Sequence, residues 1–561
     1  MPIRLINNHT LRLESFLGND VPEYAILSHT WDPDGEVTFQ ELLRFNHMTD
    51  HKFYDRRKYA KILNTCTQAR KDGIRYSWID SCCIDKTSSS ELSEAINSMY
   101  NWSQDARICY AFLTDFDLRD ATDNNLEAAL RKCRWFTRGW CLQELLAPAN
   151  VQFFDSAWRH IGFKLSMCPL LSRITSIDEG VLNGSVPIAS IPVARRMSWA
   201  AQRHTTRVED MAYSLFGIFN LRMPMLYGEG LHAFRRLQEG IIESSNDLSI
   251  LAISSKPVGD DDELRSPFLG LLAASPRDFE ACGNLTYTGT GPNLDDTFAI
   301  TNKGLYFRQA QLKVDTSKGL YMMSLNCQQS QQSEPESIYL RKVGPRLFAR
   351  YCPHSVEDSV GRGRDDPTVS TEEIYIVATI TPITHLQLGQ ADDYMISVQS
   401  RNHTLSGALQ VIQRGHWSDV WDASRLAFLT RGRMPFGGYC KVFPSRLQSI
   451  DSENACQKKH SWGHFFLLCG LARKAANSTG LPGSDIQPWV KLYLPEEWRD
   501  IEKRMGIVDD LYAAVDTENS PGTSDMAALH TVSGQHMTIN ATIEVVRAKA
   551  RPYFILRLEF N

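Results

Sequence analysis

The first 160 residues alternate between short apolar runs and longer segments with helical spacing, and this alternation constrains the fold more than any other feature. Four of the apolar runs are typical of buried strands, namely 24–28, 76–80, 108–113 and 151–154. Helical segments separate them. Strands that alternate with helices predict an α/β fold with a parallel sheet covered by helices on both faces.

The helical segments carry recognisable start and stop signals. Residues 55–72 have apolar residues at helical spacing and end at Asp72-Gly73, where glycine suits the end of a helix. Ser88-Ser-Ser-Glu91 forms a capping box before the next helix, and a short helix over 140–146 ends before Pro148. Ligands of such sheets bind beyond the carboxyl ends of the strands, so functional residues are expected there.

Two further regions follow the alternating segment. Residues 160–250 are predicted to be mainly helical, with one apolar stripe from Val208 to Phe219 and another from Leu231 to Ile242. Neither helix would be stable alone, so both should pack on the first domain. Residues 255–561 contain short β-prone runs between polar loops and predict a mostly β domain, a sandwich or a barrel.

Composition excludes several classes of protein. The formal net charge of −5 offers no basic excess for binding a phosphate backbone, so a nucleic-acid partner is not expected. The 13 cysteines include no C-x-x-C pair, which argues against a zinc ribbon or a disulfide scaffold. The N-terminus lacks a secretory signal and the longest apolar stretch, 465–472, is too short to span a bilayer. A soluble, cytoplasmic protein is therefore expected.

Three polar segments fall just beyond predicted strands, where a site is expected. They are 28–32 (SHTWD), 80–85 (DSCCID) and 138–144 (RGWCLQE). Trp140 and Glu144 are four residues apart, so they share one face of a helix. An aromatic plane beside a carboxylate suits cleavage of an N-glycosidic bond, because the transition state resembles an oxocarbenium ion.

Structural roles compete with this interpretation. Trp140 could be a core aromatic residue, Glu144 a surface carboxylate paired with an arginine, Asp80 a turn cap and His29 a structural histidine. A thiol hydrolase using Cys82 or Cys83 with His29 is a weaker alternative, because buried cysteines are usually inert. The segment 227–230 (YGEG) is interpreted as a turn between helices rather than a phosphate loop. P-loop, H-E-x-x-H and G-x-S-x-G motifs are missing.

Seven blocks in order resemble the signature of the fungal heterokaryon-incompatibility (HET) domain. They are 24–31 (YAILSHTW), 78–86 (WIDSCCIDK), 91–100 (ELSEAINSMY), 134–148 (RWFTRGWCLQELLAP), 196–200 (RMSWA), 206–210 (TRVED) and 224–230 (PMLYGEG). The resemblance covers about residues 1–250. It implies a role in non-self recognition that ends in death of the fused cell, with an incompatibility protein as a possible partner.

This family is distantly similar to Toll/interleukin-receptor (TIR) domains, and 140–145 (WCLQEL) resembles their catalytic block. The resemblance implies a flavodoxin/TIR-like sheet over residues 1–160, a helical extension to about 250, and a regulatory or sensing role for 255–561. It implies cleavage of NAD or a related nucleotide, which is a substrate rather than a cofactor, with no metal. By the same resemblance, the chain would act when self-associated, because a second protomer completes the pocket. The implied site consists of catalytic Glu144 with substrate-binding Trp140, Ser28, His29, Trp31, Asp80 and Arg138. The alternative is a non-enzymatic scaffold that self-associates and recruits partners.

Overall fold

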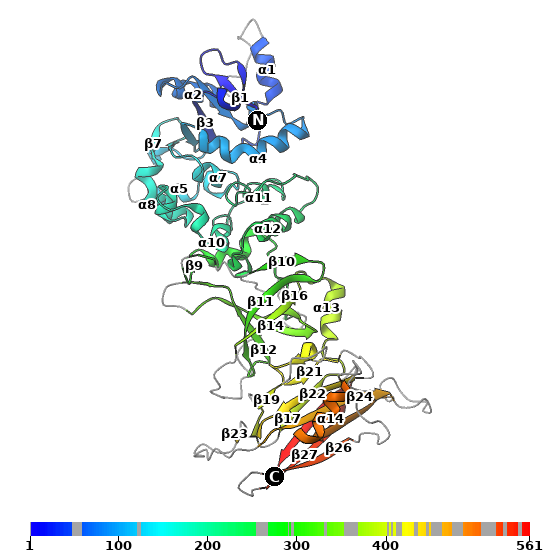
Figure 1. Cartoon of the computed structure of the whole chain (residues 1–561). Coiled ribbons are helices and arrows are strands. Elements are labelled where there is room, and N and C mark those ends of the chain that lie inside the picture. The colour runs from blue at the N-terminus through cyan, green and yellow to red at the C-terminus, as the bar shows by residue number, and fades with distance from the viewer. Residues whose placement is uncertain are drawn as a thin grey trace. The chain divides into compact units, whose positions relative to one another are not determined.

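The structure is a computed structural model of the 561-residue chain (Figure 1). It describes residues 2–47, 59–120, 125–253, 267–289, 291–292, 297–329, 334–352, 369–400, 403–405, 408–410, 418–430, 436–444, 448–449, 463–473, 486–505, 523–530, 536–547 and 552–561.

The chain divides into two compact units. The first comprises Met1–Lys256, Leu272–Leu294 and Leu325–Glu336, and the second comprises Pro257–Leu271, Asp295–Ser324 and Ser337–Asn561. The sequence placed everything beyond about residue 255 in the second domain, so two segments differ from that expectation. The first of them is tied to the first unit by Gln238, whose Nε2 donates to the carbonyl oxygen of Ala273 at 2.9 Å. Phe279 in the same segment is fully buried.

A seven-stranded sheet forms the centre of the first unit. Its strands are β1 (Pro2–Asn7), β2 (Leu13–Leu17), β3 (Tyr24–His29), β4 (Tyr76–Ile79), β5 (Ile108–Phe112), β6 (Val151–Phe154) and β7 (His160–Phe163), and their order is β2-β1-β4-β3-β5-β6-β7. Strands β4, β3, β5 and β6 are parallel neighbours. The chain steps from β3 to β4 on one side and then returns to β5 on the other, so the strand order reverses beside β3. Ligands of open α/β sheets bind at such a reversal.

The four strands predicted from apolar runs are confirmed, but the edges of the sheet were missed. Strands β1 and β2 form an antiparallel hairpin, and β1 also pairs with β4. Strand β7 pairs antiparallel with β6 in a region that the sequence assigned to helices. Strands β2 and β7 are short and partly exposed, so their apolar pattern is weaker than that of a strand buried on both faces, whereas β1 is largely buried.

Helices fill the connections of the first unit. They are α1 (Phe39–His47), α2 (Ala60–Lys71), α3 (Asp80–Cys83), α4 (Ser89–Asp105), α5 (Leu126–Arg131), α6 (Arg134–Thr137), α7 (Cys141–Leu146), α8 (Lys164–Thr175), α9 (Glu179–Leu182), α10 (Val193–Ser198), α11 (Asp210–Tyr213) and α12 (His232–Ser244). Residues 55–58 of the helix predicted over 55–72 lie outside the described residues. At the start of α4, the Ser88 side chain accepts from the Glu91 backbone N–H, as the capping signal predicted.

The predicted apolar stripe over 208–219 needs correction. Only Asp210–Tyr213 forms an α-helix there, and Val208 is exposed instead of buried. Leu231, expected in the second stripe, is also exposed and precedes α12. Helix α12 buries the rest of its stripe, including Phe234, Leu237 and Ile241.

The second unit is rich in strands, and it contains both a barrel and a sandwich. In the barrel, β11 (Gly304–Asp315), β12 (Leu320–Ser324), β14 (Ser337–Gly344), β15 (Leu347–Tyr351) and β16 (Val369–Ile376) pair in sequence, and β16 pairs back to β11. The sandwich has a sheet of order β20-β21-β17-β28-β27-β26 and another of order β19-β22-β24-β25. Buried residues of both sheets form one hydrophobic cluster, which includes Val398, Leu467, Val490 and Leu556.

The strands of the sandwich range from two-residue pairs to long central strands. They are β17 (Ile396–Ser400), β19 (Leu409–Gln410), β20 (Trp421–Asp422), β21 (Ala427–Phe428), β22 (Phe436–Val442), β24 (Phe465–Arg473), β25 (Ile486–Tyr493), β26 (Ser524–His530), β27 (His536–Arg547) and β28 (Pro552–Phe560). The β-prone character predicted for 255–561 continues to the end of the chain, where β27 and β28 pair antiparallel.

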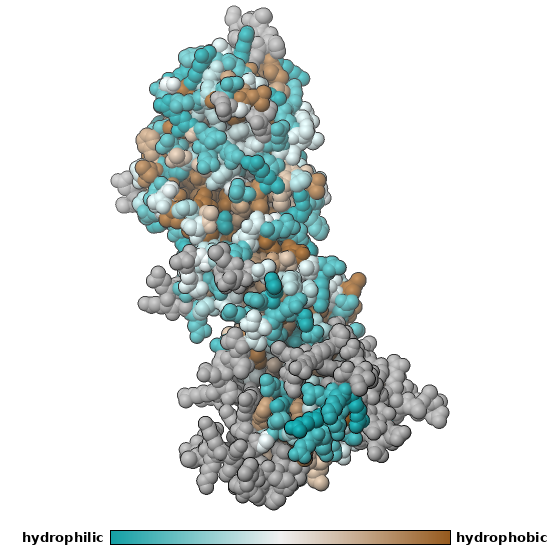
Figure 2. All heavy atoms as spheres, in the orientation of Figure 1, coloured by the Kyte–Doolittle hydropathy of each residue, from teal (hydrophilic) through white to brown (hydrophobic). Residues whose placement is uncertain are grey.

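Hydrophilic and hydrophobic residues are interspersed on the face of the first unit drawn in Figure 2. Among the helices that the structure describes, none combines the length and the apolar character needed to cross a bilayer.

Candidate functional site

A pocket of about 580 Å³ lies at the carboxyl ends of the parallel strands, where the strand order reverses. The loops after β3 and β4, helices α4, α6 and α7, and the segments near 205 and 227 all contribute to it. Its lining consists of His29, Thr30, Trp31, Asp80, Ile84, Lys86, Leu92, Ile96, Met99, Arg134, Thr137, Arg138, Trp140, Glu144, His204, Thr205, Thr206, Arg207, Asp210 and Tyr227. Six of the seven site residues proposed from the sequence are among them. Ser28, the seventh, reaches the site through a hydrogen bond to Glu144.

Glu144 presents a partly buried carboxylate to the pocket. It stands on α7, where Cys141, Leu142 and Leu145 are fully buried and anchor the helix to the sheet. Ser28, at the end of β3, donates its hydroxyl to Glu144 Oε2 and accepts from the indole N–H of Trp135 at 2.7 Å. Burial, helped by the charge of Asp80, raises the pKa of Glu144 to about 7. A carboxylate with that pKa can accept a proton near neutral pH.

Trp140 lies directly before α7 and lines the pocket together with Glu144. Its indole is half-buried, and it favours the ionised form of Asp210, whose pKa burial raises. Asp210 also accepts from the Tyr227 hydroxyl at 2.9 Å. A half-buried aromatic ring that lines a pocket suits a plane on which a flat ligand ring stacks.

Another part of the pocket contains Trp31 and Asp80 together with the cationic side chains of Lys86 and Arg138. Trp31 Nε1 donates to Asp80 Oδ2 at 3.0 Å, and Lys86 Nζ lies 3.6 Å from the same oxygen. Lys86 Nζ also sits 3.6 Å from the centroid of the Trp31 ring, and Arg138 Cζ is 5.6 Å from that centroid. Burial opposes ionisation of Asp80, but Lys86, His29 and Arg138 outweigh it and lower the pKa of this carboxyl. Asp80 is thus held as an anion in the same pocket as Glu144.

Arg138 is oriented by the backbone rather than by a carboxylate. Its Nη1 donates to the carbonyl oxygen of His29 at 3.4 Å. In the part of the chain that the structure describes, Arg138 makes no ion pair with a carboxylate within 4.0 Å. Its charge is therefore available to an anionic ligand.

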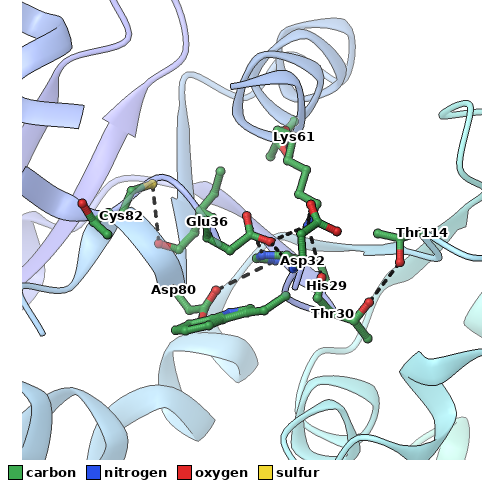
Figure 3. A network of polar contacts seen from close by, with 12 residues as sticks. His29, Thr30, Asp32, Glu36, Lys61, Asp80, Cys82 and Thr114 are labelled. Carbon is green, nitrogen blue, oxygen red and sulfur yellow. Dashed lines mark hydrogen bonds and ion pairs between the residues drawn. The ribbon is translucent and has the colours of Figure 1, made fainter. Parts of the chain in front are cut away.

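His29 lies at the floor of the pocket in a buried charged network (Figure 3). Its Nε2 is 3.6 Å from Glu36 Oε2 and its Nδ1 is 3.9 Å from Asp80 Oδ1, but neither ring nitrogen forms a hydrogen bond with the described residues. Lys61, from α2, reaches Glu36 and lies 2.8 Å from Asp32. Burial opposes ionisation of Glu36, yet His29 and Lys61 lower its pKa to about 2. This network fixes the loop after β3, which carries Trp31.

Comparisons with known proteins identify the domain. Residues 24–124 match the family model described as heterokaryon incompatibility protein (HET). The chain contains a HET domain.

A curated relative supports this assignment. Vegetative incompatibility protein HET-E-1 of Podospora anserina is 44% identical over 259 residues, which is 46% of this chain. The chain spans only 19% of the length of that protein. No solved structure matches the chain.

The HET-domain pocket also contains residues that the site prediction did not name. Lys86, His204, Arg207, Asp210 and Tyr227 all line it. Periodicity could not have assigned them to a site, because most of them stand in irregular segments. For Lys86, Arg207, Asp210 and Tyr227 the available signal was the family resemblance of blocks 78–86, 206–210 and 224–230, whereas His204 lies in none of the seven blocks.

The thiol alternative has little support in the HET domain. Cys82 and Cys83 are buried, and Cys82 Sγ is directed at the carbonyl oxygen of Ile79. Burial raises the pKa of the Cys82 thiol well above its ordinary value, which disfavours the thiolate that a nucleophile requires. Neither residue is part of the pocket lining. Within the described residues, no cluster of histidine, cysteine and carboxylate side chains suits a metal ion.

Proposed function

We propose that the chain is an effector of heterokaryon incompatibility that cleaves the N-glycosidic bond of NAD or a related nucleotide. The observation that carries the proposal is the pairing of Glu144 with Trp140 in one pocket, with Ser28 bonded to the carboxylate. The pocket is large enough for part of a nucleotide, since ligand pockets usually measure about 300–1,000 Å³.

The reaction would break the bond between the ribose anomeric carbon and the nicotinamide nitrogen. Nicotinamide leaves with the electron pair of that bond, and the anomeric carbon acquires oxocarbenium character. The Glu144 carboxylate would stabilise this developing positive charge and accept the proton of the attacking water. The products are nicotinamide, ADP-ribose and one proton, so atoms and charge balance.

Other pocket residues would hold the rest of the nucleotide. Trp140 offers a plane for stacking a base, and Asp80 offers an anionic acceptor for ribose hydroxyls. Arg138 and Lys86 flank the half-exposed ring of Trp31 and suit the pyrophosphate. His29 would act through Asp80 and Glu36 by fixing the loop that carries Trp31.

The biological part of the proposal rests on the comparisons. The relative HET-E-1 is a vegetative incompatibility protein, and we extend that role to this chain. Nucleotide cleavage in the first unit would kill the fused cell after an incompatibility partner is recognised. The second unit would regulate cleavage or sense the partner. The reversal of strand order beside β3 agrees with a TIR-like sheet.

The test combines cleavage of NAD by the purified full chain with cell killing on induced expression. We expect free nicotinamide from the wild-type chain and at least a hundredfold less from Glu144→Gln, because removing one preorganised electrostatic contact costs about 10²–10³ in rate. Glu94→Gln, an exposed carboxylate on α4, is the matched control and should behave as wild type. Because the ionised Glu144 is required, the rate should rise with pH through about 7.

A different outcome favours the scaffold. If Glu144→Gln still kills cells and depletes NAD as the wild-type chain does, the catalytic assignment is wrong. Killing without any release of nicotinamide would support a module that self-associates and recruits partners.

A further inference from the structure

One wall of the pocket comes from a segment that lies beyond the family match at 24–124. His204, Thr205, Thr206, Arg207, Asp210 and Tyr227 supply this wall, which we call the closing wall. It faces Trp140 and Glu144 from outside the sheet. If this wall is held by contacts within the same chain, the pocket does not need a second copy to close it.

The closing wall is bonded directly to the backbone that leads into α7. The His204 N–H donates to the Thr137 carbonyl at 2.7 Å, and the Gly139 N–H donates to the His204 carbonyl at 2.9 Å. These bonds form a parallel bridge between Arg138 and His204. Arg203, which is buried, adds a bond from Nη1 to the Arg138 carbonyl at 2.9 Å.

Gly139 permits this close approach. A Cβ atom at position 139 would lie 2.6 Å from Thr205 Cγ2, closer than real side chains come. A larger residue there would force the Thr205 side chain of the closing wall to move. The wall is therefore fitted to this chain's own backbone.

The far end of the closing wall is equally well fixed. Glu209 accepts from the backbone N–H groups of Gly228 and Gly230 at 2.8 and 3.1 Å, which locks the turn after Tyr227. The Tyr227 hydroxyl donates to Asp210, and the Arg207 guanidinium lies 4.4 Å from the centre of the Tyr227 ring. Both ends are thus held by bonds that a neighbouring copy does not supply.

We infer that a single copy of the chain forms the complete pocket, with the closing wall fixed against the backbone that leads into Trp140 and α7. The inference rests on the proposed function where it concerns cleavage. It departs from the expectation, drawn from TIR domains, that a second protomer completes the site. Self-association would then serve a step other than building the pocket.

The first test measures the wall without any ligand. Hydrogen exchange of the Gly139 and His204 amides would be followed in the full chain at a dilution where mass photometry finds only single copies. We expect both amides to be protected there. Exchange at the unprotected rate in single copies, with protection appearing only on self-association, would overturn the inference.

The second test uses Gly139→Ala, with Gly283→Ala as the matched control. The control Cβ meets only Ser198 Oγ, at 3.9 Å, and its backbone is in the ordinary helical region. Gly139→Ala should deprotect His204 and reduce NAD cleavage about a hundredfold, because small displacements in a site cost that much. If the His204 amide of Gly139→Ala exchanges as slowly as that of the wild-type chain, the claim that the closing wall requires glycine at position 139 is wrong.

Dilution separates this inference from the proposed function. Specific activity should stay constant as the chain is diluted from self-associated to single copies. Activity that falls in proportion to concentration would overturn the inference, while protected amides with no cleavage at any concentration would remove the enzymatic proposal and leave the closing wall standing.

Discussion

At the scale of the residue, the pocket holds two carboxyl groups whose surroundings shift their pKa values in opposite directions. Burial raises the pKa of Glu144 to about 7, whereas Lys86, His29 and Arg138 overcome burial and lower the pKa of Asp80. Groups whose pKa values are pushed apart in one site are typical of acid–base chemistry. They are also sources of pH-dependent stability.

Glu144 should make the first unit less stable as pH rises. Its folded-state pKa of about 7 exceeds its ordinary 4.5, so between these values the folded state binds more protons than the unfolded state. The free energy of unfolding must then fall as pH increases through this window. Glu144→Gln lacks the group, so its Tm should match wild type near about pH 4 and exceed it near about pH 8. Calorimetry across this range checks it, and a Tm difference that shrinks with rising pH would contradict it.

Ser28 links the stability of the core to the ionisation of Glu144. In Ser28→Ala the buried Trp135 N–H loses its acceptor, which should cost about 1–3 kcal/mol of unfolding free energy. Loss of the bond that lowers the Glu144 pKa should also move the pH midpoint of cleavage upward.

The matched control is Ser77→Ala on β4, a fully buried serine whose hydroxyl has no hydrogen-bond partner among the described residues. It should change neither denaturant midpoint nor pH profile appreciably. Equal effects of the two substitutions would show that Ser28 has no special link to Glu144.

At the scale of the element, α12 and the closing wall belong to the first unit rather than to a linker. Helix α12 buries Phe234, Leu237 and Ile241, and the wall bonds to the approach to α7. The chain from the closing wall to α12 therefore has two roles, because it contributes buried residues to the core and also lines the pocket.

Truncation near residue 160 should therefore give insoluble protein. The fragment would lose β7, α8 and α9, which contact β6, α5 and α7, and large exposed apolar patches lead to aggregation. Solubility and cooperative unfolding would be compared with the full chain expressed in parallel. A soluble 1–160 fragment that unfolds cooperatively would sink this prediction.

At the scale of the whole molecule, the division into units does not follow the order of the chain. Leu272–Leu294 and Leu325–Glu336 belong to the first unit although segments of the second lie between them. A substitution in these segments should therefore affect the unit that contains the pocket.

Two buried phenylalanines test this division. Phe279→Ala should destabilise the first unit by about 3–5 kcal/mol, and Phe428→Ala should destabilise the second by a similar amount. In calorimetry, Phe279→Ala and Phe428→Ala should each lower the midpoint of a different unfolding transition. The transition of the first unit is identified as the one whose midpoint Glu144→Gln raises at high pH. If both substitutions lower the same transition, Phe279 does not belong to the first unit alone.

Features that depend on local pattern could be predicted from the order of the residues. Apolar runs marked β3 to β6, and the rule that parallel strands share one carboxyl edge brought Trp31, Asp80, Trp140 and Glu144 to one predicted site. The capping signal at Ser88 was local in the same way. Such patterns can be recognised because burial on both faces of a strand, or on one face of a helix, fixes the spacing of apolar residues along the sequence.

Contacts between groups far apart in the chain became visible in the folded structure alone. The bond from Ser28 to Glu144 joins residues 116 positions apart, and the bridge from Arg138 to His204 closes the pocket with an irregular segment. Irregular backbone has no period, and a buried ion such as Lys61 is tolerated only because Asp32 and Glu36 surround it. These contacts join residues that are far apart in the sequence, so no local pattern could predict them.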